Sequence, residues 1–398
     1  MKTSDPKFKE SYKYLLRLLS SILCNAQPPK PNANTDWASV FYAAKDHSVV
    51  GMLCYALEKL PPEDLPPKKI MSEFKDIQLS ELILESNIQL ETEKLLNEFN
   101  SKGLQTVLLK GMVLKNYYPI SAMRTMSDVD ILYREEDKRA IKAIFVEQGY
   151  NLVSDIDNEL NFRKPPFHHY EMHAFLVGSH HKSQELFKNV WDSVEEKDDS
   201  FNLSLEYTYL YMLEHLAKHI ECAGAGLRMI MDVFVFLKSE KDNLNREVVV
   251  EGLRKLNLLE FEKKIIALAE NWFLSEDPDT ESTIAQFLLS SSTFGLTRIA
   301  FLQSNLRKER KTGRKQNGVK LIIRSLFPSY NRICARFSSA KRFKAFYPFY
   351  IIAYWCLRIF KDRNVNTSNL GYYFIKTDSE EADFLLETIK DLGLEGRM

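Results

Sequence analysis

The strongest constraint on the fold is a change in the spacing of apolar residues after Gly103. Residues 8–102 carry apolar side chains at helical spacing, broken by the loops "AQPPKPNAN" and "LPPEDLPPKK". After Gly103 the runs are short and β-rich, as in "QTVLLK", or alternate between apolar and polar, as in "DVDILY" and "HHYEMHAFLV". From about residue 204 the helical spacing returns, which predicts a small α+β unit between two helical regions.

This change of spacing suggests three parts. We expect an N-terminal helical region over residues 1–102, an α+β core over 103–200 and a C-terminal helical domain over 201–398. A chain of 398 residues is long enough for two or three domains and for a large hydrophobic core.

The charge balance limits the kinds of partner. Lys and Arg together number 54, as do Asp and Glu, so the formal net charge is zero. Binding along a long nucleic acid needs an extended basic track, so we expect no such partner. The basic segment at 307–318 favours a solvated loop, with a phosphate or nucleic-acid contact as the alternative.

Cysteine usage and apolar segments predict the cellular location. Five scattered cysteines without a CxxC pair suit reduced thiols, and the N-terminus lacks a signal-peptide layout, so we expect a cytoplasmic protein. The apolar segment 345–360 contains Pro348 and is too short to cross a bilayer. It predicts a buried C-terminal helix, and contact of residues 341–363 with a membrane surface is the alternative.

Two acids flank one valine inside the apolar run "DVDILY". On a strand, Asp128 and Asp130 point to the same face, about 6 to 7 Å apart. Unpaired, the two carboxylates would repel each other, and a divalent cation such as Mg²⁺ removes that cost. A strand end with two solvated acids is the alternative interpretation.

The residues before the acid pair suit a phosphate. In "VLLKGMVL", Gly111 follows a strand and begins a helix, where free backbone N–H groups attract an anion. Lys110 adds a positive charge beside it, and Arg124 and Ser127 precede the acids as further phosphate contacts.

The order apolar-Lys-Gly, Tyr-Pro, then Arg-x-x-Ser-Asp-apolar-Asp resembles the DNA-polymerase-β-type nucleotidyltransferase superfamily. Within it the chain is most similar to the uncharacterised nucleotidyltransferases, with AbiEii-type toxins as further relatives. Lys110-Gly111 stands where a Gly pair is usual in the superfamily, and the 15 residues between Met112 and Asp128 exceed its normal spacing. The resemblance implies a small mixed-sheet core, two Mg²⁺ ions and an NTP substrate, with ATP the expected one.

The resemblance also implies roles for single residues. Asp128 and Asp130 would bind the metals, Gly111 would hold the triphosphate, and Glu171 would be the third acid, since the family has an acid-apolar-His step there. His173 shares the face of Glu171. The alternatives for the third acid are Asp155 and Asp157, which the sequence places in a turn.

A downstream helical signature, "LEHLAKHIECAGAGLRMIMDVFVFLK", is also similar to the family. It implies that His219, Arg228 and Asp232 line the nucleotide side of the cleft. Alternatively, Arg228 and Asp232 pair with each other at i,i+4, and His219 caps a helix.

A zinc site built from histidines is not favoured. The candidate ligands are His168, His169, His173, His180 and His181. Because the segment alternates like a strand, His168 falls on the opposite face from His169 and His173.

The preferred function is therefore a metal-dependent nucleotidyltransferase that moves NMP from an NTP onto a hydroxyl or phosphate and releases pyrophosphate. The acceptor class stays open among a small molecule, a peptide or protein side chain and an RNA end. A non-catalytic nucleotide-binding module is one alternative, and a toxin or defence protein with the same fold is another.

Overall fold

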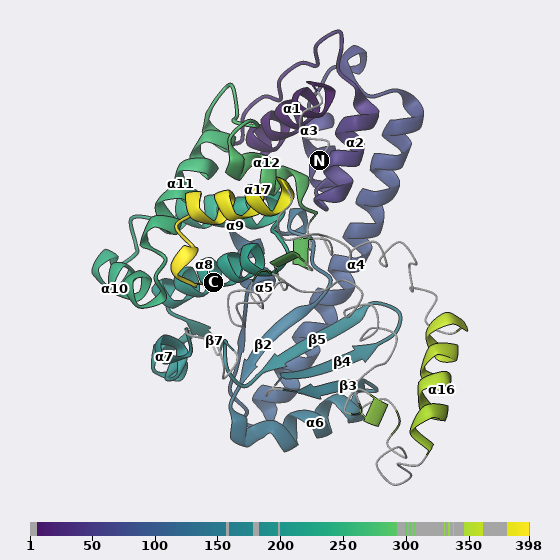
Figure 1. Cartoon of the computed structure of the whole chain (residues 1–398), viewed down its shortest axis with the longest axis vertical. Helices are drawn as coiled ribbons and strands as arrows, with labels where there is room; N and C mark the ends of the chain where they lie inside the picture. Colours follow the sequence, from purple (N-terminus) through teal and green to yellow (C-terminus); the bar gives the residue numbers. More distant parts are fainter. Residues whose placement is uncertain are drawn as a thin grey trace.

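A computed structural model gives the arrangement of the chain (Figure 1). It describes residues 6–156, 159–177, 183–197, 200–292, 346–360 and 380–397, with short stretches between residues 299 and 337. Asp157, His180, His181 and the basic segment 307–318 lie outside the described residues.

Seven strands form one mixed sheet in the order β3-β4-β5-β2-β1-β7-β6. Their bounds are β1 Thr106–Leu108, β2 Val129–Tyr133, β3 Asn151–Ile156, β4 Glu159–Lys164, β5 His168–His173, β6 Val194–Lys197 and β7 Ser200–Leu203. β2 runs parallel to β5 and antiparallel to β1, and β1 runs parallel to β7. The expected α+β fold with a mixed sheet is confirmed.

Helices surround this sheet and form a large body above it in Figure 1. The bounds are α1 Pro6–Leu23, α2 Trp37–Asp46, α3 Val50–Leu57, α4 Lys68–Ser101, α5 Gly111–Leu114, α6 Lys138–Glu147, α7 Gln184–Phe187, α8 Leu205–Cys222, α9 Leu227–Glu240, α10 Arg246–Leu256, α11 Leu259–Leu274, α12 Thr283–Ser290, α16 Tyr347–Phe360 and α17 Glu380–Asp391. Several begin at a side-chain cap, as α2 does at Asp36 and α8 at Ser204.

One hydrophobic core joins helices from both ends of the chain. Leu15 of α1, Leu53 of α3, Leu213 of α8 and Trp272 of α11 are all fully buried and belong to one cluster. Apolar burial of this extent is the main source of stability for such a helical body. The division into residues 1–102, 103–200 and 201–398 stays a prediction.

A second core lies between the sheet and the helices α4 and α6. It contains Leu95 and Phe99 of α4, Phe145 of α6 and Phe162 of β4. The rings of Phe145 and Phe162 are stacked, with centroids 4.0 Å apart. This core fixes the face of the sheet opposite the acid cluster, because successive strand residues point to opposite faces.

The segment predicted as a buried helix near the C-terminus is a helix, α16, but its expected burial is wrong. Phe346 just before it and Phe349 and Ile352 on it are 54, 66 and 61% exposed, and Tyr354 is buried. Among the described residues, α16 packs against a small cluster that includes Ile333 and Cys334, which covers only one side of the helix. Within the described residues, no helix is both long and apolar enough to cross a membrane.

Candidate active site

The two central strands bring three acids together. Asp128 immediately precedes β2, Asp130 lies on it, and the parallel register pairs Asp130 with Glu171 of β5. Asp128 and Asp130 therefore share a face with Glu171, as the alternation in the sequence predicts. Asp155 is not part of this group, and its expected turn is wrong: it lies on β3, ion-paired with Lys138 and Lys142.

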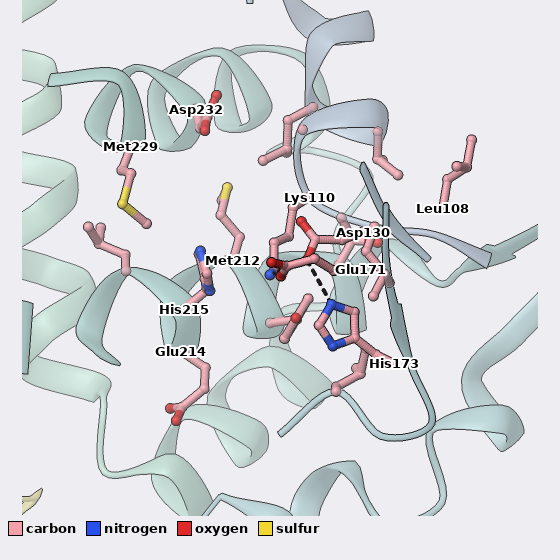
Figure 2. Close-up of a pocket in the computed structure, with 18 of the residues that line it drawn as sticks. Leu108, Lys110, Asp130, Glu171, His173, Met212, Glu214, His215, Met229 and Asp232 are labelled. Carbon is pink, nitrogen blue, oxygen red and sulfur yellow. Dashed lines mark hydrogen bonds and ion pairs between the residues drawn. The ribbon is translucent and has the colours of Figure 1, made fainter. Parts of the chain in front are cut away.

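Asp130 is the most buried of these acids, at 7% exposure. Its Oδ1 accepts hydrogen bonds from Lys110 Nζ at 2.7 Å and from His173 Nε2 at 2.8 Å (Figure 2). Burial alone would raise the pKa of Asp130, but the charge of Lys110 and the hydrogen bond from His173 outweigh it and hold that pKa well below its usual range. Asp130 is therefore ionised, the form in which a carboxylate can bind a metal.

Lys110, which contacts Asp130, has an unusual backbone conformation. Its φ of 45° and ψ of −117° at the end of β1 are values that glycine adopts readily and lysine rarely does. This is the position where the superfamily usually has a glycine. The ammonium also lies 5.9 Å from the centre of the Tyr211 ring, so it faces both the acid cluster and α8.

The acids and two histidines form two overlapping groups with metal-ligand spacing. Asp130, Glu171 and His173 make one, and Asp128, His169 and Glu171 make the other. In each group the potential ligand atoms all lie within 4.8 Å of one another. Three atoms at this spacing can bind one cation at ordinary metal–ligand distances of about 2.0 to 2.2 Å if the side chains move slightly toward one another. The carboxylates of the two groups thus fit a pair of divalent cations that share Glu171.

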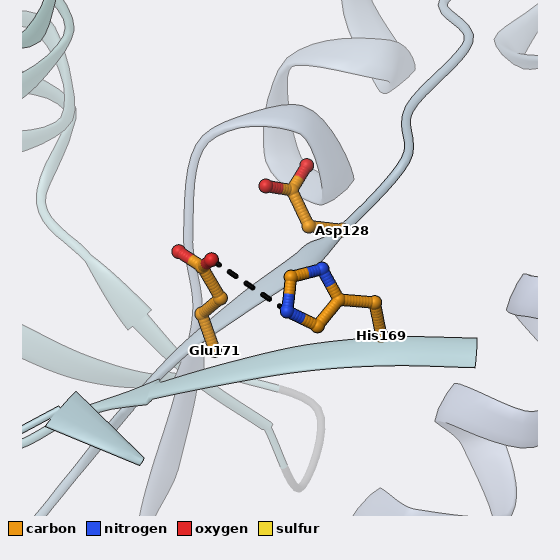
Figure 3. Close-up of side chains that lie close together, drawn as sticks. All are labelled: Asp128, His169 and Glu171. Carbon is orange, nitrogen blue, oxygen red and sulfur yellow. Dashed lines mark ion pairs between the residues drawn. The ribbon is translucent and has the colours of Figure 1, made fainter. Parts of the chain in front are cut away.

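The surroundings of Glu171 favour the protonated form of its carboxyl group. Burial raises its pKa, and the charges of Asp130 and Asp128 raise it further. His169 stands beside it, with Nε2 3.7 Å from Glu171 Oε1 (Figure 3). A carboxylate with a raised pKa accepts a proton more readily, which is what proton removal from a hydroxyl requires.

A cavity of about 540 Å³ lies between the sheet and helices α8 and α9, and the three acids line it. From the sheet side come Lys110, Asp128, Asp130, Glu171 and His173. Figure 2 shows His215 of α8 across the cavity from the acids. The volume falls within the range of small-molecule pockets, about 300 to 1,000 Å³.

The predicted residues of the downstream helices reach the same cavity. His219, Arg228 and Asp232 all line it. Burial, followed by the charge of Lys110, lowers the pKa of His219 to about 4, so its imidazole is neutral. Burial, followed by the charge of Arg124, lowers the pKa of Arg228 to about 10.

Asp232 pairs with Arg124 and not with its helical neighbour. Arg124 Nε and Nη2 donate to the two oxygens of Asp232 at 3.0 and 2.8 Å, and Tyr118 Oη donates at 2.8 Å. Arg228 instead donates to the carbonyl of Thr125 at 2.7 Å. The pair ties the segment before β2 to α9, so Arg124 and Asp232 have a structural role that the sequence did not predict.

The remaining predicted phosphate contacts, Gly111 and Ser127, lie close to the acid cluster. Gly111 lines the cavity, and a Cβ there would lie 3.1 Å from Arg124 Nη1. The helix it begins, α5, has only four residues, so its dipole is weaker than the sequence suggested. Ser127 is exposed and donates to Asp128 Oδ1 at 3.1 Å.

Sequence reasoning missed several residues of the site. The sequence pattern suggests His169 only as a zinc ligand. It gives no role to Glu159, Tyr211 or His215, and all three line the cavity. Alternation in "HHYEMH" already placed His169 on the face of Glu171, which is the signal that would have found it. His168 lies on the opposite face, as predicted.

Comparison with known proteins gives matches at two levels. A family model described as uncharacterised nucleotidyltransferase matches residues 33–274, more than half of the chain. No curated protein matches. Among solved structures, the antibiotic-resistance factor ANT(2'')-Ia is 12% identical with a TM-score of 0.33, over 46% of this chain and 95% of that one. The polyadenylate synthase of Megavirus is 13% identical with a TM-score of 0.28, over 45% and 39%.

Proposed function

The chain belongs to the uncharacterised nucleotidyltransferase family, and we propose from this that it transfers NMP from an NTP, with ATP the expected one, to a hydroxyl or phosphate. The observation that carries the proposal is the meeting of Asp128, Asp130 and Glu171 at one wall of the cavity, with Lys110 beside them. A binding module that only holds nucleotide has no need for three converging acids.

In the proposed reaction the acceptor oxygen attacks the α-phosphorus of the NTP. The bond from that phosphorus to the oxygen bridging to the β-phosphate breaks, and pyrophosphate leaves. The proton of an attacking hydroxyl passes to Glu171, whose raised pKa suits it for this step. Two divalent cations, held by Asp128, Asp130 and Glu171, would neutralise charge on the attacking and leaving oxygens.

Other residues of the cavity would bind the nucleotide. Lys110 and Gly111 lie at the end of β1, where the triphosphate is expected, and Lys110 can exchange its contact with Asp130 for one with a phosphate. His219 of α8 and Arg228 of α9 would contact the nucleotide. Ser127 at the rim would add a hydroxyl donor.

The acceptor would be a small molecule, a peptide or protein side chain, or an RNA end. The zero net charge of the sequence speaks against a long polynucleotide. The five cysteines are free, which suits a reducing compartment such as the cytoplasm. The toxin or defence role differs from this proposal only in the acceptor.

The test is to incubate the purified protein with each labelled NTP, a divalent metal and a cell extract, and to identify what becomes labelled. Asp128→Asn with Asp130→Asn should lower the transfer rate by at least about a hundredfold, because the metal ligands are lost. Asp155→Asn is the matched control, since this acid of the same sheet lies outside the cluster. Undiminished transfer by the double variant, with its fold checked by circular dichroism, would refute the proposal.

The same experiment separates the enzyme from a binding module. A binding module would hold NTP in the presence of metal without releasing pyrophosphate. Measurement of pyrophosphate alongside NTP binding therefore distinguishes the two functions in one preparation.

A further inference from the structure

His169 is a residue for which the proposed reaction has given no role. It lies on β5 two residues before Glu171, and its side chain is 19% exposed. Figure 3 shows its imidazole beside the carboxylates of Asp128 and Glu171. The three side chains have ligand atoms within 4.8 Å of one another.

A short hydrogen-bond chain fixes the proton of this imidazole. Asn161 of β4 donates its amide Nδ2 to Glu159 Oε1 at 2.7 Å, and since a carboxylate only accepts, the amide oxygen must face the other way. That oxygen, Oδ1, lies 3.0 Å from His169 Nε2. An amide oxygen also only accepts, so Nε2 carries the proton.

The other ring nitrogen then holds the lone pair. A neutral imidazole carries a single proton, so with that proton on Nε2 the Nδ1 atom is unprotonated. Donation of one ring N–H to a neighbouring oxygen while the other nitrogen binds metal is the usual arrangement of metal-ligating histidines. Glu159 and Asn161 thus prepare His169 as a ligand.

His173 does not offer the same lone pair. Its Nε2 is 2.8 Å from Asp130 Oδ1, and since the carboxylate accepts, this nitrogen donates. His173 therefore orients Asp130. The two histidines on this face of β5 have different roles, one as ligand and one as support.

We propose that His169 binds metal through Nδ1 and gives the cation site of Asp128 and Glu171 a preference for Mn²⁺ over Mg²⁺. Mg²⁺ favours an all-oxygen shell, whereas first-row transition metals accept imidazole nitrogen. The two carboxylates keep the site hard, which suits Mn²⁺ among those metals. This inference deepens the proposed function, since it concerns the same site.

The test uses metal alone, without nucleotide. Mn²⁺ and Mg²⁺ are titrated separately into the full chain, and the Mn²⁺ form is examined by electron spin-echo spectroscopy for coupling to ¹⁴N. The wild-type protein should bind Mn²⁺ at least about tenfold more tightly than Mg²⁺ and show nitrogen coupling.

Three variants locate the ligand. His169→Ala should lose the nitrogen coupling and about 10- to 100-fold in Mn²⁺ affinity, with less than about a threefold change for Mg²⁺. Asn161→Ala should lower Mn²⁺ affinity about tenfold with His169 still present. His168→Ala, on the opposite face of the same strand, should change neither affinity.

Two results would overturn the inference: nitrogen coupling that persists in His169→Ala, or an equal loss of both metals in that variant. Failure here can be told apart from failure of the proposed function. Nucleotide transfer without nitrogen coupling leaves the function standing and removes the ligand. Nitrogen coupling without transfer to any acceptor does the reverse.

Discussion

The buried pair Arg124–Asp232 allows a quantitative test of how the sheet is attached to the helical body. Arg124 is 8% exposed and Asp232 is 3% exposed, and the guanidinium makes two charged hydrogen bonds to the carboxylate. Arg124→Met would leave the Asp232 carboxylate buried with Tyr118 as its remaining donor among the contacts above. We therefore expect the free energy of unfolding to fall by about 3 to 5 kcal/mol.

The reasoning predicts a smaller loss when both charges are removed. Replacing a buried pair by apolar groups of similar volume is often close to neutral, so Arg124→Met with Asp232→Leu should recover most of the loss of Arg124→Met. The coupling energy from the double-mutant cycle should therefore be at least about 3 kcal/mol. Arg254→Met, an exposed arginine of α10, should stay within about 0.5 kcal/mol of the wild type.

The assay is urea denaturation followed by the fluorescence of the four tryptophans, with midpoints converted through a common slope. A loss below about 1 kcal/mol for Arg124→Met would show that water or a rearranged neighbour compensates Asp232. A double variant as unstable as the sum of the single variants would refute the pairing itself.

Two further predictions concern stability. Burial lowers the pKa of His47 from 6.5 to about 4, so the unfolded chain binds the proton first as the pH falls. The contribution of His47 to the free energy of unfolding is therefore complete above pH 6.5 and falls by about 3 kcal/mol by pH 4. In urea titrations at several pH values, the stability of His47→Gln should depend less on pH, and an unchanged pH dependence would contradict the role of His47. Gly224 has a φ of +98°, and a Cβ there would lie 2.5 Å from Ser291 Oγ, so Gly224→Ala should cost at least about 2 kcal/mol, and a loss under 0.5 kcal/mol by the same method would contradict the strain.

The sequence predicts the acid face of the sheet well because that prediction needs only the period of a strand. Alternation places Asp128 and Asp130 on one side, whereas the choice of Glu171 as the third acid came from the family resemblance, through its acid-apolar-His step. What brings Glu171 opposite Asp130 is the parallel register of β5 on β2, which depends on the whole sheet. β3 escapes prediction because it is an exposed edge strand, with Val153 57% exposed, so no alternation of burial marks it.

The sequence pattern does not predict contacts between distant segments of the chain. Helical spacing suggests that Arg228 pairs with Asp232, yet the partner is Arg124, 108 residues away. Three-dimensional packing determines which arginine pairs with Asp232, and no local sequence pattern predicts that partner. The orientation of His169 by Asn161 is similar, since it needs the antiparallel pairing of β4 with β5.

The long helix α4 belongs to both hydrophobic cores. Phe74 near its beginning packs in the helical core, while Leu95 and Phe99 near its end pack against the sheet. At 1.5 Å per residue, its 34 residues form a rod of about 50 Å. Between those contacts, the buried ion pair of Glu85 with Lys115 joins the rod to the turn after α5. Unfolding of either half of α4 would remove a packing surface from the other half, so the sheet and the helical body should unfold in one cooperative step.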